Sequence, residues 1–176
     1  MIIAPRLLLA AVGVAGVGAL ALAAFLQHAR GFEPCPWCVL QRLVVLVIVV
    51  AALAGASPPA GQRARSIVGA ALAVLLAIGG LAAALYQHLV VAHSTSCALT
   101  AADRIISALH LAELWPAMFE ATARCDEANM PWLGVPFALW GALTFMVLGL
   151  ASAWAFWGAR RSDQRDWPLD PIRDRY

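Results

Sequence analysis

Lysine is absent from this 176-residue sequence, and charged residues of all kinds make up only 12% of it. An average globular domain carries about 25% charged residues and about 45–50% apolar ones. Here 62% of the residues are hydrophobic. These proportions exclude a disordered chain, a nucleic-acid-binding protein and most soluble enzymes. The length favours one domain over two.

Long runs without charge predict an all-α membrane protein: a four-transmembrane-helix bundle with a long outer loop that carries a short amphipathic helix. Uncharged runs near residues 7–26 and 130–159 exceed the roughly 18 residues that indicate a membrane helix. The second span is the weakest, because extending it back to Cys38 places Gln41 and Arg42 in its first turn. The predicted spans are residues 7–26, 38–56, 67–90 and 135–157, within a single integral membrane domain of residues 1–176.

Arginine is distributed unevenly between the predicted connections, and this sets the orientation. Eight arginines lie on the side that holds both termini, the 57–66 loop and the 158–176 tail. The other side holds only Arg30, Arg42, Arg104 and Arg124. Basic residues gather on the cytoplasmic side of membrane proteins. We therefore expect both termini in the cytoplasm, and the loops 27–37 and 91–134 outside.

Residues 1–23 have an alternative interpretation as a cleaved signal peptide, since Ala21-Leu22-Ala23 resembles a cleavage site. The apolar stretch is about twenty residues long, whereas a signal peptide has an apolar region of about 7–15. Its removal would leave three spans and reverse the arginine argument. We therefore keep residues 7–26 as the first span.

The outer loop 91–134 is net acidic and contains one segment with an amphipathic helical pattern, residues 103–114. Thr100, followed three residues later by Asp103, resembles a capping box. We expect a short helix there, able to lie on the membrane surface.

All four cysteines fall in the predicted outer part of the chain: Cys35, Cys38, Cys97 and Cys125. Four cysteines allow three pairings, and the spacing favours Cys35 with Cys38 and Cys97 with Cys125. A Cys-x-x-Cys disulfide closes a very small ring and adds little stability through loop entropy. Such pairs are more often redox pairs or metal ligands, and disulfides persist in oxidising compartments such as the bacterial periplasm.

Cys38 would begin the second span, where the unpaired N–H groups and the helix dipole favour a thiolate. Arg42 follows one turn later on the same face, and its positive charge would favour the thiolate further. An arginine at membrane level is costly and tends to be functional. The alternative is that Arg42 extends to the lipid headgroups and has no role in chemistry.

The second cysteine pair and the histidines leave other interpretations open. Cys97 and Cys125 could form a purely structural disulfide. A closed zinc site commonly uses two short-spaced pairs, which the 97–125 spacing does not provide. The histidines do not form a metal-spaced cluster in the sequence: His28, His88, His93 and His110. We therefore predict no metal site.

The segment Cys35-Pro36-Trp37-Cys38-Val39-Leu40-Gln41-Arg42 at the start of the second of four spans, with a second outer cysteine pair, resembles the DsbB family of disulfide bond formation proteins. Tyr86-Gln87-His88 and Trp132-Leu133-Gly134-Val135-Pro136 also resemble segments of the family. The resemblance covers most of the chain. In the vitamin K epoxide reductase family the Cys-x-x-Cys follows the loop pair, whereas here it precedes that pair. Transmembrane reductases of the DsbD type need cysteines within the membrane core, accessible from both sides, and none of the four cysteines here is predicted near the cytoplasmic face.

The resemblance implies a membrane disulfide oxidoreductase of the bacterial inner membrane. A reduced periplasmic DsbA-like oxidase would attack the Cys97–Cys125 disulfide at Cys97, and the electrons would pass to Cys35–Cys38. Cys38 would react with a membrane quinone, with ubiquinone favoured over menaquinone, and Cys35 would resolve the adduct. Arg42 would stabilise the thiolate and the quinone oxygen, and His88 is expected near the quinone ring.

Three classes of function remain from the residues alone. They are a quinone-linked thiol oxidase, a structural or interaction membrane protein with two inert disulfides, and a metal-binding membrane protein. Cysteine reactivity separates the first two, and metal content separates the third. The resemblance favours the oxidase.

Overall fold

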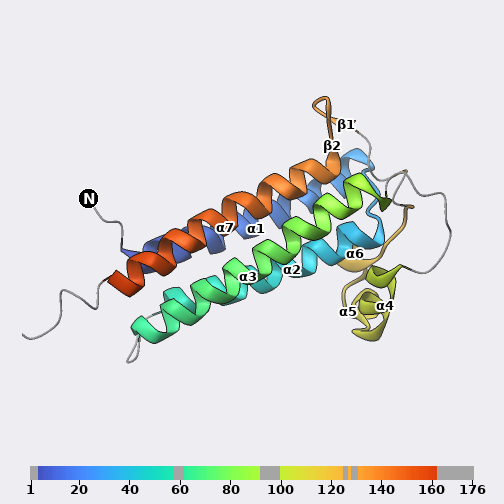
Figure 1. The fold of residues 1–176 in the computed structure, drawn as a ribbon. Helices are drawn as coiled ribbons and strands as arrows, with labels where there is room; N and C mark the ends of the chain where they lie inside the picture. The colour runs from blue at the N-terminus through green and yellow to red at the C-terminus, as the bar shows by residue number, and fades with distance from the viewer. Residues whose placement is uncertain (1–3, 58–61, 92–99, 125–126, 128–130, 162–176) are drawn as a thin grey trace, which may run out of the picture.

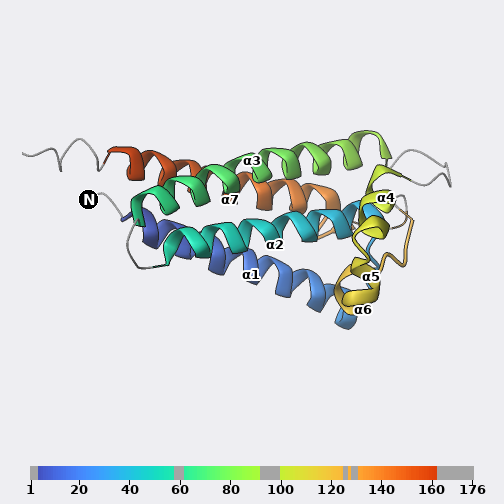
Figure 2. The same cartoon turned by 90° about the horizontal axis from the view of Figure 1, so that it is seen from below.

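The computed structural model describes residues 4–57, 62–91, 100–124, 127 and 131–161. Within these ranges four helices are long and apolar enough to cross a membrane: α1 (Pro5–Arg30), α2 (Pro36–Ala56), α3 (Gln62–Leu89) and α7 (Phe137–Arg161). They run side by side, with α3 packed against α2 and α7, and with α1 closing the bundle against the same two helices (Figure 1, Figure 2). The chain is therefore an all-α, multi-pass membrane protein, as predicted.

The helices do not coincide with the uncharged runs. A run ends at the first charged or polar residue, whereas a helix ends where its backbone is capped. Helix α1 continues past Leu26 through four more residues and stops at Gly31, whose φ of 69° is left-handed. Glycine adopts this conformation at little cost. Helix α2 begins with Pro36 in its first turn, a position where the missing N–H costs nothing.

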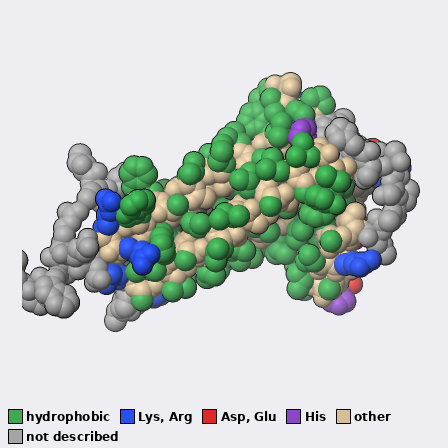
Figure 3. Space-filling model, in the orientation of Figure 1, with side chains coloured by type: hydrophobic (Ala, Val, Ile, Leu, Met, Phe, Trp, Pro, Cys, Tyr) green, Lys and Arg blue, Asp and Glu red, His purple; other side chains and the backbone are tan. Residues whose placement is uncertain are grey.

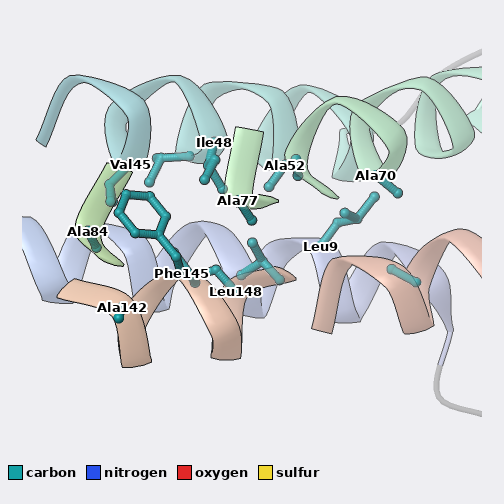
Figure 4. Packing of buried hydrophobic residues seen from close by; sticks show 14 residues of the cluster. Leu9, Val45, Ile48, Ala52, Ala70, Ala77, Ala84, Ala142, Phe145 and Leu148 are labelled. Atoms are coloured by element: carbon teal, nitrogen blue, oxygen red, sulfur yellow. The ribbon is translucent and has the colours of Figure 1, made fainter. Parts of the chain in front are cut away.

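Small residues let the helices approach closely in the centre of the bundle. A Cβ added at Gly80 of α3 would lie 2.2 Å from the ring of Phe145 on α7, so the absent side chain makes room for that ring. Gly69 has the same role against α2, since its Cβ would lie 2.6 Å from the carbonyl oxygen of Ala51. Phe145 is 1% exposed and packs beside Val45 and Ile48 (Figure 4). Close backbone contact of this kind is the main attraction between helices in lipid.

One end of the bundle carries all the short elements that the structure describes: α4 (Ala101–Ala108), α5 (Leu111–Leu114), α6 (Pro116–Phe119) and the hairpin of β1 (Pro131–Trp132) with β2 (Val135–Pro136) (Figure 1). Thr100 and Asp103 form a reciprocal capping box at the start of α4. The single helix predicted over residues 103–114 is wrong in its extent. The chain breaks at His110, whose φ is 51°, and resumes as the one-turn helix α5.

The outer surface of the four long helices is apolar, as Figure 3 shows along the visible face. Val14, Leu75 and Leu150 are 71%, 66% and 67% exposed. Apolar surface of this extent fits a lipid environment and not water. Basic side chains gather at the end opposite α4, where Figure 3 shows a group of them. The described arginines there are Arg6, Arg63, Arg65, Arg160 and Arg161.

Candidate functional site

The sulfur atoms of Cys35 and Cys38 lie 3.0 Å apart at the start of α2. Cys35 is the N-cap residue, and its sulfur accepts a hydrogen bond from the backbone N–H of Cys38 at 3.4 Å. Both side chains are buried, at 0% and 9% exposure. The first turn of the helix therefore brings the two reactive atoms into contact, and its N–H groups favour negative charge on them.

A glutamine amide of the neighbouring helix α3 contacts this pair, and a second glutamine amide, on α2, contacts the first. The Nε2 of Gln87 donates to the sulfur of Cys35 at 3.3 Å and to the sulfur of Cys38 at 3.2 Å. The Oε1 of Gln87 accepts from Nε2 of Gln41 at 2.6 Å. Gln87 is 1% exposed and Gln41 is 8% exposed. Sulfur and amide therefore satisfy each other inside an otherwise apolar bundle.

Arg42 is held inside the protein and does not extend to the headgroups, because it is only 7% exposed. Its Nη1 donates to Oε1 of Gln27 on α1 at 2.6 Å and to the carbonyl oxygen of Met118 on α6 at 3.1 Å. Its Nη2 lies 3.5 Å from the carbonyl oxygen of Ala23. A buried arginine needs partners of this kind. They fix the guanidinium one turn from Cys38, between the loop helices and α1.

The chain after α6 is joined to the cysteine pair by its backbone. The N–H groups of Thr122 and Ala123 both donate to the carbonyl oxygen of Pro34, at 3.0 and 3.2 Å. Ala123 packs against Cys35 and Cys38. This contact holds residues 122–123 of the outer loop directly beside the pair.

A cavity of about 140 Å³ opens beside Cys38. An apolar cavity of about this size holds a single six-membered ring. Its polar lining residues include Gln41, Arg42, Gln87 and Thr144, and Leu22 of α1, which is 45% exposed, also lines it. Its aromatic lining residues are Trp132, Phe137, Trp140 and Phe145.

The aromatic part of the cavity wall is itself held together at the hairpin. The Nε1 of Trp140 donates to the carbonyl oxygen of Trp132 at 3.1 Å, and the two ring centroids lie 5.1 Å apart. The hairpin turn places Leu133 and Gly134 at φ 54° and 80°. Positive φ at both turn positions is the geometry of a tight two-residue hairpin. The turn thus brings Trp132 back over the start of α7.

The predicted site residues fall into three groups. Cys35, Cys38 and Arg42 come together at the cavity end of α2. His88 is not among the residues that line the cavity, and its Nδ1 is buried without a hydrogen-bond partner in the described part of the chain. Cys97 and Cys125 lie outside the described residues.

Sequence reasoning named Gln41 and Gln87 only as parts of motif segments, and it gave no role at the site to these two residues or to Gln27. A signal was available for each. They are polar amides next to or inside apolar helices, where an unpaired amide is costly. Their partners could not be inferred, because the bond between Gln41 and Gln87 joins residues 46 positions apart.

Comparison with known proteins places the sequence among membrane disulfide-forming proteins. The sequence model of the DsbB family, described as "Disulfide bond formation protein DsbB", matches residues 5–155. The chain is 31% identical to Disulfide bond formation protein B of Nitrosospira multiformis over 162 residues, which are 92% of this chain and 95% of the relative. It is 36% identical to Disulfide bond formation protein B 1 of Pseudomonas putida over 126 residues, 71% and 74% of the two chains. It is 39% identical to Disulfide bond formation protein B of Pseudomonas syringae pv. tomato over 127 residues, which are 72% of this chain and 73% of the relative.

Proposed function

The chain belongs to the DsbB family of disulfide bond formation proteins, and from this membership we propose that it is a thiol:quinone oxidoreductase that reoxidises a DsbA-like partner. Membership makes it a membrane disulfide oxidoreductase that acts with a disulfide-forming partner. The finer assignments are the proposal: two cysteine pairs carry the electrons, and a membrane quinone, with ubiquinone favoured over menaquinone, receives them.

The observation that carries the proposal is the position of the Cys35–Cys38 pair beside a ring-sized cavity. The sulfurs are 3.0 Å apart, so formation of the disulfide needs little movement. When the S–S bond forms, the pair loses two electrons and two protons. Reoxidation of a strong oxidant, with a potential near −120 mV, needs an acceptor of higher potential.

The residues around the cavity fit a quinone headgroup, which has an apolar ring and polar carbonyl oxygens. Aromatic and aliphatic side chains supply most of the wall, and Arg42 supplies a cation that can hold a polar or anionic oxygen. A quinone bound there would supply a lipid-soluble acceptor for two electrons and two protons. Arg42 and the aromatic wall would hold it, while the surrounding helices exclude water from Cys38.

The second pair would bring electrons from the partner. We propose that a partner thiolate attacks the Cys97–Cys125 disulfide at Cys97, forms a mixed disulfide and is released when its second thiol closes its own disulfide. The resulting dithiol then reduces Cys35–Cys38 by thiol–disulfide exchange. The bond from Ala123 to Pro34 supports this exchange, because Cys125 follows Ala123 by two residues, a stretch that spans at most about 7 Å.

The orientation belongs to the same proposal. We place the chain in a bacterial inner membrane, with both termini in the cytoplasm and the cysteines on the periplasmic side. The gathering of basic side chains at the end opposite the Cys35–Cys38 pair supports it. An oxidising periplasm would keep the pairs in exchange with secreted thiols.

An anaerobic assay tests the proposal. Purified full-length protein is mixed with ubiquinone-1 or menaquinone-1 and a reduced DsbA-like protein, and quinone absorbance is followed. We expect quinone reduction by the wild type and by Ser152→Ala, a buried change far from the cysteines, and none by Cys38→Ser. No reduction by the wild type with either quinone would contradict the proposal and leave a protein with structural disulfides.

A further inference from the structure

We propose that Gln87, oriented by Gln41, stabilises the reduced form of the Cys35–Cys38 pair and thereby raises its reduction potential. The inference rests on the proposed function in one respect, that this pair is redox-active. It adds a chemical role for two neutral amides, and it makes Gln41 a positioning residue that acts through Gln87.

One amide nitrogen contacts both sulfurs of the pair. The Nε2 of Gln87 lies 3.3 Å from the sulfur of Cys35 and 3.2 Å from that of Cys38. An N–H donor binds a thiolate much more strongly than a neutral sulfur, because the bond is charge-assisted. Reduction of the disulfide takes up two electrons and yields two sulfurs that accept better. The donor therefore favours the reduced side of the couple.

Gln41 contacts the other end of the Gln87 amide. Its Oε1 accepts a hydrogen bond of 2.6 Å from Nε2 of Gln41. A reversed amide would place Oε1 against the sulfurs and its NH₂ against the NH₂ of Gln41. That arrangement would set two donors against each other and would place Oε1 against a thiolate, which has no proton to donate. The hydrogen bond from Gln41 therefore favours the orientation of Gln87 in which Nε2 faces the cysteines.

Helix α7 provides space for the Gln41 side chain. A Cβ added at Gly141 would lie 2.5 Å from Oε1 of Gln41. No side chain fits there unless the Gln41 amide moves. Gly141 on α7, Gln41 on α2 and Gln87 on α3 thus form one line of contacts that ends at the sulfurs, and a change at any of them reaches the pair.

The residue type also follows from this geometry. Glutamate at position 87 would be similar in shape but, when ionised, would offer only acceptors. Its charge would repel a thiolate nearby. Gln87→Glu therefore separates hydrogen-bond donation from the filling of space, and Gln87→Leu removes the amide altogether.

A redox titration of the isolated pair tests the inference. The full-length chain with Cys97→Ser and Cys125→Ser, purified free of quinone, is equilibrated with buffers of reduced and oxidised glutathione of graded ratio. Thiols are then trapped with a maleimide that shifts the band on a gel. We expect Gln87→Leu and Gln87→Glu to favour the disulfide about tenfold over the parent, which is about 30 mV for a two-electron couple. Ser152→Ala is the matched control and should not shift.

Gln41→Leu and Gly141→Ala touch neither sulfur, and each should shift the equilibrium in the same direction by a few-fold. They keep the inference testable if the Gln87 variants do not fold. Values within about 1.5-fold of the parent for the folded variants would overturn the inference while leaving the proposed function intact. A parent pair that no glutathione ratio converts between dithiol and disulfide would contradict both.

Discussion

The two ends of the bundle use arginine in different ways. At one end Arg42 is 7% exposed and donates to oxygens of α1 and α6. At the other end Arg160 and Arg161 are exposed, and their guanidinium carbons lie 5.4 and 4.8 Å from the ring centroids of Phe156 and Trp157. Burial of Arg42 has an unfavourable desolvation free energy, and its hydrogen bonds hold the cation in one position. Arg160 and Arg161 lie at the surface, so their desolvation free energy is small.

The difference separates two roles of arginine in this chain: a buried cation beside a reactive group, and exposed charges that orient the chain in the membrane. Charge on the membrane boundary sets the orientation of the chain, and it can be supplied by any of several residues. Charge beside Cys38 is one group with fixed partners. We therefore expect substitutions at the two ends to have different effects. Those near Cys38 should change the reaction rate, and those at the opposite end should change membrane insertion or stability.

The largest effect is expected for Arg42→Met, a change that keeps the length of the side chain but removes the cation. Loss of one preorganised group that stabilises developing charge typically lowers a rate by about 10²–10³. We expect a loss of this size in the single-turnover rate of quinone reduction. The matched control is Arg161→Met at the far end, which should retain the wild-type rate. Equal rates for the two variants would erase the distinction between the ends.

A smaller effect is expected for Gln27→Leu, which removes the acceptor 2.6 Å from the Arg42 guanidinium. A hydrogen bond to a charged group contributes about 1.5–3 kcal/mol, so misplacement of the guanidinium should lower the rate about tenfold. Gln27→Glu keeps an acceptor in the same place and should recover most of the loss. The idea that Gln27 positions Arg42 fails if leucine and glutamate behave alike in that assay.

Gly69→Ala should change stability and leave the chemistry alone. The added Cβ would lie 2.6 Å from the carbonyl oxygen of Ala51, so α2 and α3 must separate. Overpacking of this kind costs about 1–3 kcal/mol. We expect a lower thermal unfolding midpoint in detergent, measured by circular dichroism, and an unchanged redox equilibrium of Cys35–Cys38 with glutathione. The matched variant is Gly79→Ala, because a Cβ at Gly79 meets nothing within 4 Å.

The smallest effect is expected for the double change Arg160→Ser with Arg161→Ser. An exposed cation–π contact contributes only about 0.5–1 kcal/mol, and neither side chain is near the cysteines in the chain. Quinone reduction should stay within about twofold of the wild type. A larger loss in correctly inserted protein would show that the far end takes part in the chemistry.

The four long helices could be predicted because lipid imposes a strong and simple pattern, about twenty apolar residues for each span. The second span was the weakest prediction for a physical reason. Gln41 and Arg42 interrupt its apolar run, and they are tolerated because Gln87, Gln27 and Met118 satisfy them. A hydropathy pattern along one segment does not include the hydrogen-bond partners that other helices supply.

The helix predicted over residues 103–114 shows the same limit from another side. Its apolar pattern is continuous, but the chain turns at His110 so that residues on both sides can pack on α2. Ile106, Met118 and Phe119 are buried in one cluster with Val39. That docking is a tertiary contact, which local periodicity does not contain.

The central claim is that the Cys35–Cys38 pair transfers two electrons to a quinone held beside Arg42, and an anaerobic single turnover tests it most directly. The full-length chain with Cys97→Ser and Cys125→Ser is reduced, freed of reductant and mixed with excess ubiquinone-1. Quinol and the remaining thiols are counted together. The account predicts about one quinol per chain with loss of both thiols, because one disulfide releases two electrons. Thiols that persist beside unreduced quinone, in a pair that still exchanges with dithiothreitol, would contradict it.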